Sequence, residues 1–427
     1  MTNALTQLKQ EYLLALLTGV VVVGITAVPP LRDREIRVLG FVYGIEMEVP
    51  EPHSSLKLNV CFLGEKIFSR DVEEADDVEG VGQHLEERDL AEGGWRDAFL
   101  ERAILTTVEV CNEFTTWKLN KSQKRILRGI GFGIFTHGQI FQHLDRHLIG
   151  ALVERWRSET NTFHFPLGEM TITLEDVGFI LGLPVTGRPV IAPPPEATNK
   201  RTARDFFTSI PQEQFSRGGI NLKWLVDTYK VLPENYTGEM LVLYTQAFLL
   251  WVMGAILFPT TSKNTVSVKY LPLLGNLREV GDYAWGAAVL SYLYRALHKA
   301  TRPDSKAICA CLSLLQVWSY EHLATGAPTR RDGTDKVWPR LCAWEYSRKE
   351  SHYQRRVDPH HNITFYRGEF DCLSPVQMRW APYSRLARRV GESFVFTLSG
   401  LQRTPLIHFE VAEWQLPDRA MRHFDCL

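Results

Sequence analysis

The spacing of apolar residues predicts a mainly helical chain. Apolar positions recur three and four residues apart in several long segments, which is the spacing of one face of an α-helix. The helices predicted in this way cover residues 139–156, 220–231, 240–257, 282–299 and 303–323, and a last helix begins at Pro417–Asp418. The run 240–257 is apolar almost throughout, so we expect it to be a fully buried core helix. Asp282 is the predicted N-cap of its helix.

Three shorter runs late in the chain are rich in β-branched and aromatic residues and predict strands. They cover residues 362–366, 393–398 and 405–411. The sequence has no internal repeat of solenoid period. The predicted fold is therefore mainly α: a single large helical domain with minor late β-strands.

The segment from Trp156 to Val190 holds the most specific local pattern in the chain. Thr173 and Asp176 have the spacing of a capping box, in which two residues three positions apart close the start of a helix. Gly182 suits a left-handed C-terminal cap, and Pro184 prevents continuation. We therefore expect a helix of about eight residues between these signals.

A helix of this kind can open a helix-turn-helix motif, because such motifs often carry a glycine at the turn. A DNA-reading motif then requires a second, recognition helix. The residues that follow, 184–190, contain two prolines and a glycine and cannot form a regular helix. We therefore interpret the block as a packing helix closed by a turn.

The same block resembles the signature of the plant mobile domain, a family also labelled aminotransferase-like. The resemblance rests on Trp156, His164, Gly168, Glu169, Thr173, Asp176, Gly182 and Pro184. Later segments resemble the family in the same order, at residues 245–274, 281–300, 311–323 and 405–424. The resemblance implies a nuclear protein that acts in meristem maintenance, gene expression, transposon silencing and genome stability. It also implies a phosphatase-like protein partner and a link to transposable elements.

The N-terminal part of the chain differs in character from the rest. Of the eleven tryptophans only Trp95 precedes Trp117, and residues 71–97 hold eleven acids against two arginines, which is typical of a solvated linker. These features predict an N-terminal extension of unassigned fold over residues 1–115. A plant-mobile-domain-like helical domain is predicted over residues 116–427.

Residues 12–28 form an uncharged, apolar run within that extension. The length of the run is at the lower limit for a membrane-spanning helix, and its β-branched residues and glycines weaken a helix. Three interpretations stay open: a buried strand or core segment, an N-terminal membrane anchor, or a signal peptide.

Composition and charge narrow the function only slightly. A formal net charge of −1 over 427 residues gives no global electrostatic reason to expect nucleic acid or membrane binding. The seven cysteines are scattered without a C-x-x-C pair, which indicates reduced thiols and argues against a structural zinc site. Cys309 and Cys311 lie inside the predicted helix at 303–323, so their side chains should point apart.

The sequence has no motif that indicates a cofactor. A pyridoxal phosphate enzyme needs a lysine for the Schiff base, but Lys223, Lys269 and Lys299 have no recognisable cofactor context. Dinucleotide, P-loop, zinc-protease and hydrolase motifs are also missing from the sequence. We therefore expect no cofactor, no metal and no aminotransferase activity.

Three other groups of side chains are weaker candidates for chemistry. His164 lies near Glu159 and Glu169 in sequence, so a pair could perform acid–base work or form a structural hydrogen bond. Residues 358–362 place two histidines beside an acid, although adjacent residues rarely converge on one ion. A transposon-derived nuclease would need three carboxylates around two metals. The available carboxylates are Asp176, Asp227, Asp282 and Glu321.

The best candidate interaction surface is a tract between residues 330 and 389 that alternates basic and aromatic side chains. Its members are Arg330, Arg331, Trp338, Arg348, Lys349, Arg355, Arg356, Trp380, Arg388 and Arg389. Arginine beside aromatic rings suits phosphate contact with base stacking. The same composition serves protein interfaces or a solvated face over a core, and these readings stay open.

We therefore predict a non-enzymatic nuclear domain that interacts with protein or nucleic acid. The alternative is a transposon-derived nuclease or other nucleic-acid-processing enzyme. A convergent carboxylate cluster would favour the enzyme, and a closed helical core with a basic and aromatic surface would favour the interaction domain. The alternative localisation is a membrane anchored through residues 12–28.

Overall fold

The computed structural model describes the chain in stretches. These are residues 116–137, 144–194, 210–216, 219–262, 264–302, 307–327, 336–344 and 362–422, with a few single positions between them and three short strands before them. The chain divides into two compact units, Met1–Glu87 and Arg88–Leu427. In the first unit, strand β1 (Ile25–Ala27) pairs antiparallel with β2 (Val38–Gly40). The first of these strands lies within the apolar run 12–28, whose other residues are outside the described part of the chain.

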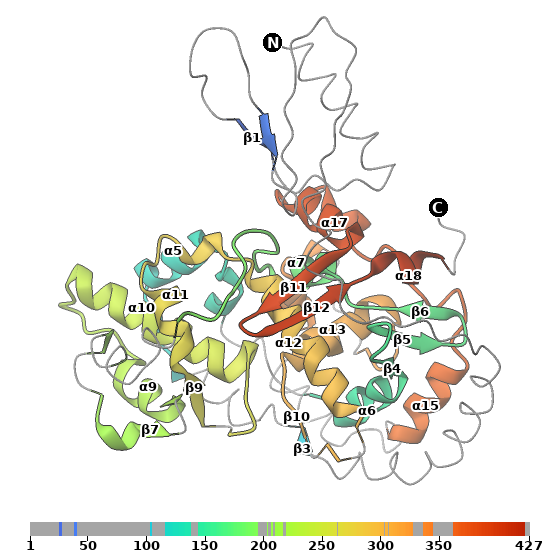
Figure 1. The fold of residues 1–427 in the computed structure, drawn as a ribbon, viewed down its shortest axis with the longest axis horizontal. Helices are drawn as coiled ribbons and strands as arrows, with labels where there is room; N and C mark the ends of the chain where they lie inside the picture. Colours follow the sequence, from blue (N-terminus) through green and yellow to red (C-terminus); the bar gives the residue numbers. More distant parts are fainter. Residues whose placement is uncertain are drawn as a thin grey trace, which may run out of the picture. The chain divides into compact units, whose positions relative to one another are not determined.

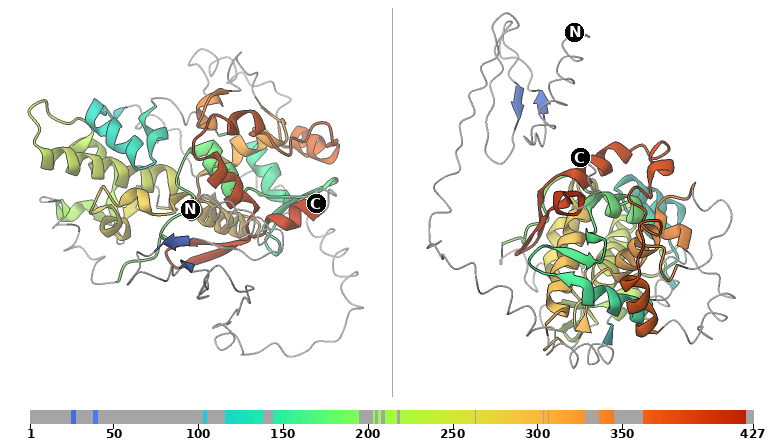
Figure 2. Two further views of the ribbon diagram at one scale, coloured as in Figure 1. Left: turned by 90° about the horizontal axis from the view of Figure 1, so that it is seen from above. Right: turned by 90° about the vertical axis from the view of Figure 1, so that its right-hand side faces the viewer.

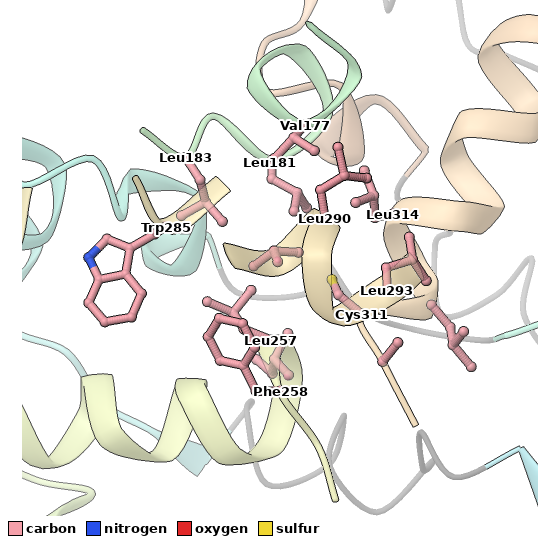
Figure 3. Close-up of a cluster of buried hydrophobic side chains, with 14 of the residues drawn as sticks. Val177, Leu181, Leu183, Leu257, Phe258, Trp285, Leu290, Leu293, Cys311 and Leu314 are labelled. Atoms are coloured by element: carbon pink, nitrogen blue, oxygen red, sulfur yellow. The ribbon is translucent and has the colours of Figure 1, made fainter. Parts of the chain in front are cut away.

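Helix α12 (Trp285–Ala300) forms the centre of the second unit. Helix α7 (Leu174–Leu181) packs against it, and the antiparallel hairpin of β11 (Thr404–His408) and β12 (Val411–Gln415) lies along it (Figure 1). Figure 3 shows the apolar cluster that joins α12 to its neighbours, with Trp285 at one side. The Trp285 ring is fully buried, and its Nε1 donates to the carbonyl of Val280 at 2.7 Å.

Helix α10 (Gly238–Val252) continues into a π-helical turn, Met253–Leu257. Helices α5 (Lys121–Gly129), α9 (Leu222–Tyr229) and α11 (Leu271–Leu274) pack against it. Among the described residues, this long helix is the single one with the length and apolar composition to cross a membrane. Every residue from Thr245 to Leu257 is buried in the protein, whereas the first two turns are partly exposed. The prediction of a core helix is therefore confirmed for its second half.

Helices α13 (Leu312–His322) and α15 (Ile363–Asp371) both pack on α6 (Arg146–Arg155). Polar bonds fix this packing. Asp145 caps α6 through the backbone N–H groups of its first turn, and the Tyr366 hydroxyl donates to the other oxygen of Asp145. Arg367 donates two hydrogen bonds to Glu154, at 2.9 and 2.6 Å.

Small sheets join these helices. Strands β4 (Trp156–Arg157), β5 (Thr162–Phe165) and β6 (Gly168–Met170) form one antiparallel sheet. Strands β7 (Phe215–Ser216), β8 (Gly219–Asn221) and β9 (Thr265–Ser267) form another. Strand β3 (Ala103–Ile104) pairs parallel with β10 (Ala307–Ile308). The fold is thus mainly α with several small sheets.

Three short helices lie near the end of the chain: α16 (Ser384–Ala387), α17 (Ser393–Leu401) and α18 (Pro417–Arg422). Helix α17 packs on α7, and α18 packs on β6 (Figures 1 and 2). The prediction of a last helix at Pro417–Asp418 is confirmed. The predicted strands at 362–366 and 393–398 are wrong, because these residues begin α15 and α17; only the run 405–411 forms strand structure.

Several predicted helix starts are also corrected. The helix predicted from 139 begins at Arg146, and residues 138–143 lie outside the described residues. The helix predicted from 303 begins at Leu312, so Cys309 and Cys311 precede it.

Asp282 is not an N-cap. The cap position of α12 belongs to Ala284, and Asp282 ends a 3-10 turn, where its carbonyl accepts the N–H of Arg188 at 2.7 Å. A local sequence pattern located this helix but not the long-range bond that determines its start.

Candidate functional site

The capping signals of the signature block are confirmed. The backbone N–H and the hydroxyl of Thr173 both donate to Asp176 Oδ2, at 2.7 and 3.0 Å. Helix α7 ends at Gly182, whose φ of 66° is left-handed. A Cβ at Gly182 would lie 2.8 Å from the Pro339 side chain, so close packing as well as the turn requires glycine. No helix forms over residues 183–190, as predicted.

Other signature residues hold the block against its surroundings. Trp156 is the first residue of β4, and its ring is fully buried. The ring centroid lies 4.8 Å from that of Phe163 and 5.1 Å from that of Tyr294. Gly168 has a φ of 129°, which only glycine adopts readily. The carbonyl of Pro184 accepts the N–H of Gly286 at 2.7 Å, which ties the turn to α12.

The second oxygen of Asp176 organises a buried polar cluster. Asp176 Oδ1 accepts from His322 Nε2 at 2.7 Å and from the Tyr383 hydroxyl at 2.8 Å. These residues come from α7, from the last turn of α13 and from the cap position of α16. Sequence reasoning named Asp176 but missed both partners.

The electrostatics of this cluster favour a charged pair. Burial raises the pKa of the Asp176 carboxyl, but the facing His322 and the hydrogen bonds outweigh burial, so the pKa lies below its ordinary value. Burial lowers the pKa of His322, but Asp176 outweighs it and the pKa is raised. Burial, with Asp176 adding to it, raises the pKa of Tyr383 well above its ordinary value, so the phenol stays a donor.

A second buried ion pair adjoins the first. Glu321 Oε1 accepts from Arg340 Nε at 2.8 Å and from Trp344 Nε1 at 2.6 Å. Glu321 directly precedes His322 in α13, so this pair follows the Asp176–His322 pair by one residue on the same helix. Both members of the Glu321–Arg340 pair are buried, with side chains 2% and 3% exposed, so the pair holds residues 336–344 against α13.

The cluster is poorly placed for acid–base work on a bound molecule. The side chains of His322 and Asp176 are only 11% and 3% exposed. Each carboxylate already accepts bonds from protein donors. The geometry therefore locks α7, α13 and the loop before α16 together.

The carboxylates considered for a nuclease do not share one open site. Asp176 and Glu321 belong to the buried cluster, whereas Asp227 is exposed on α9. Asp282 is exposed in its turn, 3.7 Å from Arg188. Within the described part of the chain, no group of three His, Cys, Asp or Glu side chains could hold a metal ion. Most of residues 358–362 lies outside that part.

His164 contributes to a structural contact of the small sheet. Its Nε2 lies 3.7 Å from Glu169 Oε1. The hydroxyl of Thr162 donates to Glu169 at 3.0 Å, and the Arg419 guanidinium of α18 lies 3.3 Å from the same carboxylate. Burial raises the pKa of Glu169, but these donors outweigh burial and the pKa is lowered. The third residue considered, Glu159, is exposed.

The three lysines considered for a cofactor lie on separate elements. Lys223 and Lys299 are exposed on α9 and α12, and Lys269 pairs with Glu410.

A second polar network was also missed from sequence. His298 of α12 bonds Asn161 at 2.6 Å, and Asn161 donates to the carbonyl of Trp414 at 3.0 Å. Arg295, one turn earlier, lies 2.8 Å from Glu413 on β12. Burial lowers the pKa of His298 to about 4. The network joins the sheet of β4–β6 to the β11–β12 hairpin.

Of the predicted basic and aromatic tract, the structure describes Trp338, Trp380, Arg388 and Arg389. The other members, Arg330, Arg331, Arg348, Lys349, Arg355 and Arg356, lie outside the described residues. Trp380, Arg388 and Arg389 are exposed.

Trp338 packs on the helices rather than standing free. Its Nε1 lies 3.3 Å from the carbonyl of Gly178, and its ring stacks 6.5 Å from that of Phe396 in α17. The residue is nevertheless 38% exposed. It therefore connects the predicted tract to α17.

Helix α17 has an apolar side that faces away from its support. Phe396, Ser399 and Gly400 are buried on one side. A Cβ at Gly178 would meet the Phe396 ring at 2.4 Å, which shows how closely α17 sits on α7.

The opposite side carries Phe394, Leu398 and Leu401, at the i, i+4 and i+7 spacing of one helix face. Phe394 is 68% exposed and Leu401 53% exposed. We call these three residues the α17 face; it was not predicted, because the sequence indicates a strand over residues 393–398.

A helical domain closed by buried ion pairs around a capped signature helix is thus the class of protein that the fold defines. The chain belongs to the plant mobile domain family, whose sequence profile matches residues 131–427. This confirms the resemblance noted in the signature block.

Relatives from Arabidopsis thaliana support this assignment. MAIN-LIKE 2 is 38% identical over 331 residues, which cover 76% of this chain and 48% of that protein. MAINTENANCE OF MERISTEMS is 37% identical over 327 residues, which cover 76% of this chain and 66% of that protein. The chain thus spans about half to two thirds of the length of these relatives. No solved structure matches the chain significantly.

A further relative carries a different name. Serine/threonine-protein phosphatase 7 long form homolog, also from Arabidopsis thaliana, is 36% identical over 314 residues. The match covers 69% of this chain but only 23% of that protein. Sequence of this family therefore occurs as a minor part of a protein named as a phosphatase.

Proposed function

We propose that this chain is a non-enzymatic interaction domain that binds a protein partner through the α17 face and the adjoining Trp338. The observation that carries the proposal is the apolar row of Phe394, Leu398 and Leu401 on a helix without a charged residue. Phe394 and Leu401 are exposed, and Leu398 between them is half-buried. Contiguous exposed apolar patches are uncommon on soluble proteins, and where they occur they often mark interaction sites.

The state of the buried acids supports a binding role over a catalytic one. Asp176 accepts bonds from three side chains, those of Thr173, His322 and Tyr383. Glu321 accepts bonds from two, and all five donors are buried or half-buried. A catalytic carboxylate must reach a reacting group. These two instead hold helices together.

The proposed setting is the nucleus, in meristem maintenance, with roles in gene expression, silencing of transposable elements and genome stability. The relative named MAINTENANCE OF MERISTEMS supports meristem maintenance. The nuclear setting and the other roles rest on the family resemblance alone. The alternative setting is a membrane, reached through residues 12–28. The test is fluorescence microscopy of a tagged chain that lacks residues 1–30. If this chain is found in the nucleus just as the full chain is, residues 12–28 are not an anchor. If the full chain is found at a membrane and the shortened chain is not, the anchor is established.

The proposed partner is a phosphatase-like protein. A relative whose name is that of a phosphatase contains a region similar to most of this chain. A region of this family that shares one chain with a phosphatase-named protein supports the association of the two as separate chains.

Affinity purification of the tagged full chain, with and without nuclease, followed by mass spectrometry tests this function. We expect a phosphatase-like protein that survives nuclease treatment and is lost with the double variant Phe394→Asp and Leu401→Asp. Val242→Asp is the matched control, because Val242 is an exposed apolar residue on α10 (39% exposed). If the partners are lost after nuclease treatment, they are held to the chain through nucleic acid, and the proposal of direct protein binding is wrong. Metal-dependent cleavage of DNA or RNA by the pure chain would establish the nuclease alternative instead.

A further inference from the structure

A row of unpaired arginines precedes α17. Arg379, Arg385, Arg388 and Arg389 are all exposed, and none of their side chains forms an ion pair in the described part of the chain. The segment from Cys372 to Leu401 contains these four arginines and a single acidic residue, Glu392. This strip therefore carries uncompensated positive charge.

The arginines and the α17 face form one continuous stretch of chain. Arg389 lies five residues before Phe394, and the Ser393 N–H bonds the carbonyl of Val390, which turns the chain directly from α16 into α17. Five residues span at most about 18 Å even when fully extended. A single bound segment can therefore contact both the charged and the apolar part.

We propose, resting on the proposed function, that this surface docks an acidic amphipathic segment of the partner protein. Leucine-like side chains of the segment pack on Phe394, Leu398 and Leu401. Its carboxylates bind Arg385, Arg388 and Arg389, whose guanidinium groups donate paired hydrogen bonds to a carboxylate.

The spacing of the α17 face favours a helical occupant. Helices that bind in grooves present anchors at i, i+3, i+4 and i+7. The nine residues of α17 span about 13 Å of helix axis. This length matches about two and a half turns of a partner helix.

The chemistry of the face disfavours two other occupants. Single-stranded nucleic acid would use the arginines and could stack bases on the exposed rings of Trp380 and Phe394. Leu398 and Leu401, which complete the α17 face, offer no ring on which a base stacks. An anionic membrane would also use basic and apolar groups together, but stable membrane attachment needs a larger apolar area than one short helix face.

The test measures binding of a fluorescent peptide to the full chain. The probe is a helical peptide of about 18 residues with leucine at i, i+3, i+4 and i+7, about four glutamates that are not spaced i, i+4 from one another, and alanine elsewhere. Its controls are the same pattern with lysine for glutamate, and a scrambled glutamate–leucine sequence. We expect only the first peptide to bind, and we expect about tenfold weaker binding when salt rises from about 50 to about 200 mM, because salt screens exposed charges.

Matched variants separate the two parts of the surface. Arg388→Glu with Arg389→Glu should weaken peptide binding at least about tenfold, as should Phe394→Asp with Leu401→Asp. Arg278→Glu and Val242→Asp, which change an exposed arginine and an exposed valine elsewhere, should leave it unchanged. Unaltered melting temperatures establish that the variants fold.

The outcomes distinguish this inference from the proposed function. If Arg388→Glu with Arg389→Glu keeps the phosphatase-like partner while Phe394→Asp with Leu401→Asp loses it, the interaction domain stands and the acidic segment is wrong. If both keep it, both proposals fall. Tighter binding of a single-stranded oligonucleotide, or of phosphatidylserine vesicles, than of the acidic peptide would overturn the inference in favour of that ligand.

Discussion

Asp176 divides its two carboxylate oxygens between a local task and a distant one. Oδ2 closes the start of α7 through Thr173, and Oδ1 joins α7 to His322 and Tyr383. Removing the carboxylate would therefore uncap a helix and leave a buried charged histidine without its partner. The second loss is the larger one, because an unpaired buried charge cannot recover its hydration.

Asp176→Ala should lower the free energy of unfolding by about 3–5 kcal/mol, the cost typical of breaking a buried ion pair. Asp227→Ala is the control, because Asp227 is exposed on α9, and its effect should stay within about 0.5 kcal/mol. Urea unfolding followed by circular dichroism measures both. A loss similar in the two variants would show that the Asp176 cluster contributes little to stability.

The histidine of this cluster predicts a loss of stability at alkaline pH. The folded-state pKa of His322 is raised above its ordinary 6.5, so its contribution is complete below pH 6.5 and is lost as pH rises through the folded value. Asp176, with a lowered pKa, loses its contribution only as pH falls below about 3.8. The melting temperature of the native chain should therefore exceed that of His322→Gln most at about pH 6, and the difference should shrink toward about pH 9. A constant difference would contradict a charged His322.

His408 predicts the opposite pH dependence. Its ring is buried, stacks 4.4 Å from that of Phe258 and bonds the Tyr270 hydroxyl at 2.9 Å. Burial lowers the pKa of His408 to about 3. Below pH 6.5 this histidine is therefore protonated in the unfolded chain but stays neutral in the folded chain. Relative to His408→Gln, the native chain should lose about 2 kcal/mol of unfolding free energy between pH 6.5 and about pH 5. Parallel denaturation curves for the two proteins would show that His408 titrates normally.

The local and distant bonds of Asp176 explain what sequence reasoning could reach. Thr173 is three residues away, so the capping box was readable from spacing. His322 and Tyr383 are 146 and 207 residues away, and no local pattern connects them. The Asn161–His298 bond spans 137 residues and was missed for the same reason.

At the scale of the element, α17 shows how tertiary packing overrides local propensity. Its sequence holds two phenylalanines and a valine and no charge, which favours a strand. The chain nevertheless forms a helix because Gly178 and Gly400 allow α7 and α17 to approach closely, with the Phe396 ring over Gly178. Because apolar residues also lie on the outward side, the sequence lacks the polar face that would identify an amphipathic helix.

Gly178→Ala tests this close approach. The new Cβ would lie 2.4 Å from the Phe396 ring, so α17 must move, and we expect a loss of about 1–3 kcal/mol in unfolding free energy. Gly368→Ala is the matched control in the exposed part of α15, where a Cβ meets nothing within 4 Å. That change should stabilise the chain by up to about 1 kcal/mol through helix propensity. Equal stabilisation by both substitutions would show that α17 yields without cost.

At the scale of the whole molecule, the helical class and the order of the large helices followed from apolar spacing. The starts of α12 and α13 could not be predicted in this way. Helix α12 begins after a long-range backbone bond between Arg188 and Asp282, and α13 begins after the short strand β10. The candidate interaction surface at residues 330–389 stays a prediction. The α17 face, which follows it in the chain, was not predicted, because a helix with apolar residues on opposite sides has no single-sided period.

The pairing of β3 with β10 makes the boundary of the helical unit testable. Ala103 and Ile104 pair with Ala307 and Ile308, directly before α13, so a chain that begins at residue 116 lacks one strand of this pair. A chain that begins at residue 88 keeps it. Because each backbone hydrogen bond contributes about 1 kcal/mol, the shorter chain should be about 1–2 kcal/mol less stable, which lowers the melting temperature by about 2–6 °C.

Scanning calorimetry on both truncated chains measures this difference. Ala307→Pro in the longer chain removes a backbone donor from the same ladder and should reproduce part of the loss. It should have a smaller effect in the shorter chain, in which β10 has no partner strand. Identical melting temperatures of the two truncated chains would place the boundary of the folded unit at residue 116 and show that the β3–β10 pair contributes little to stability.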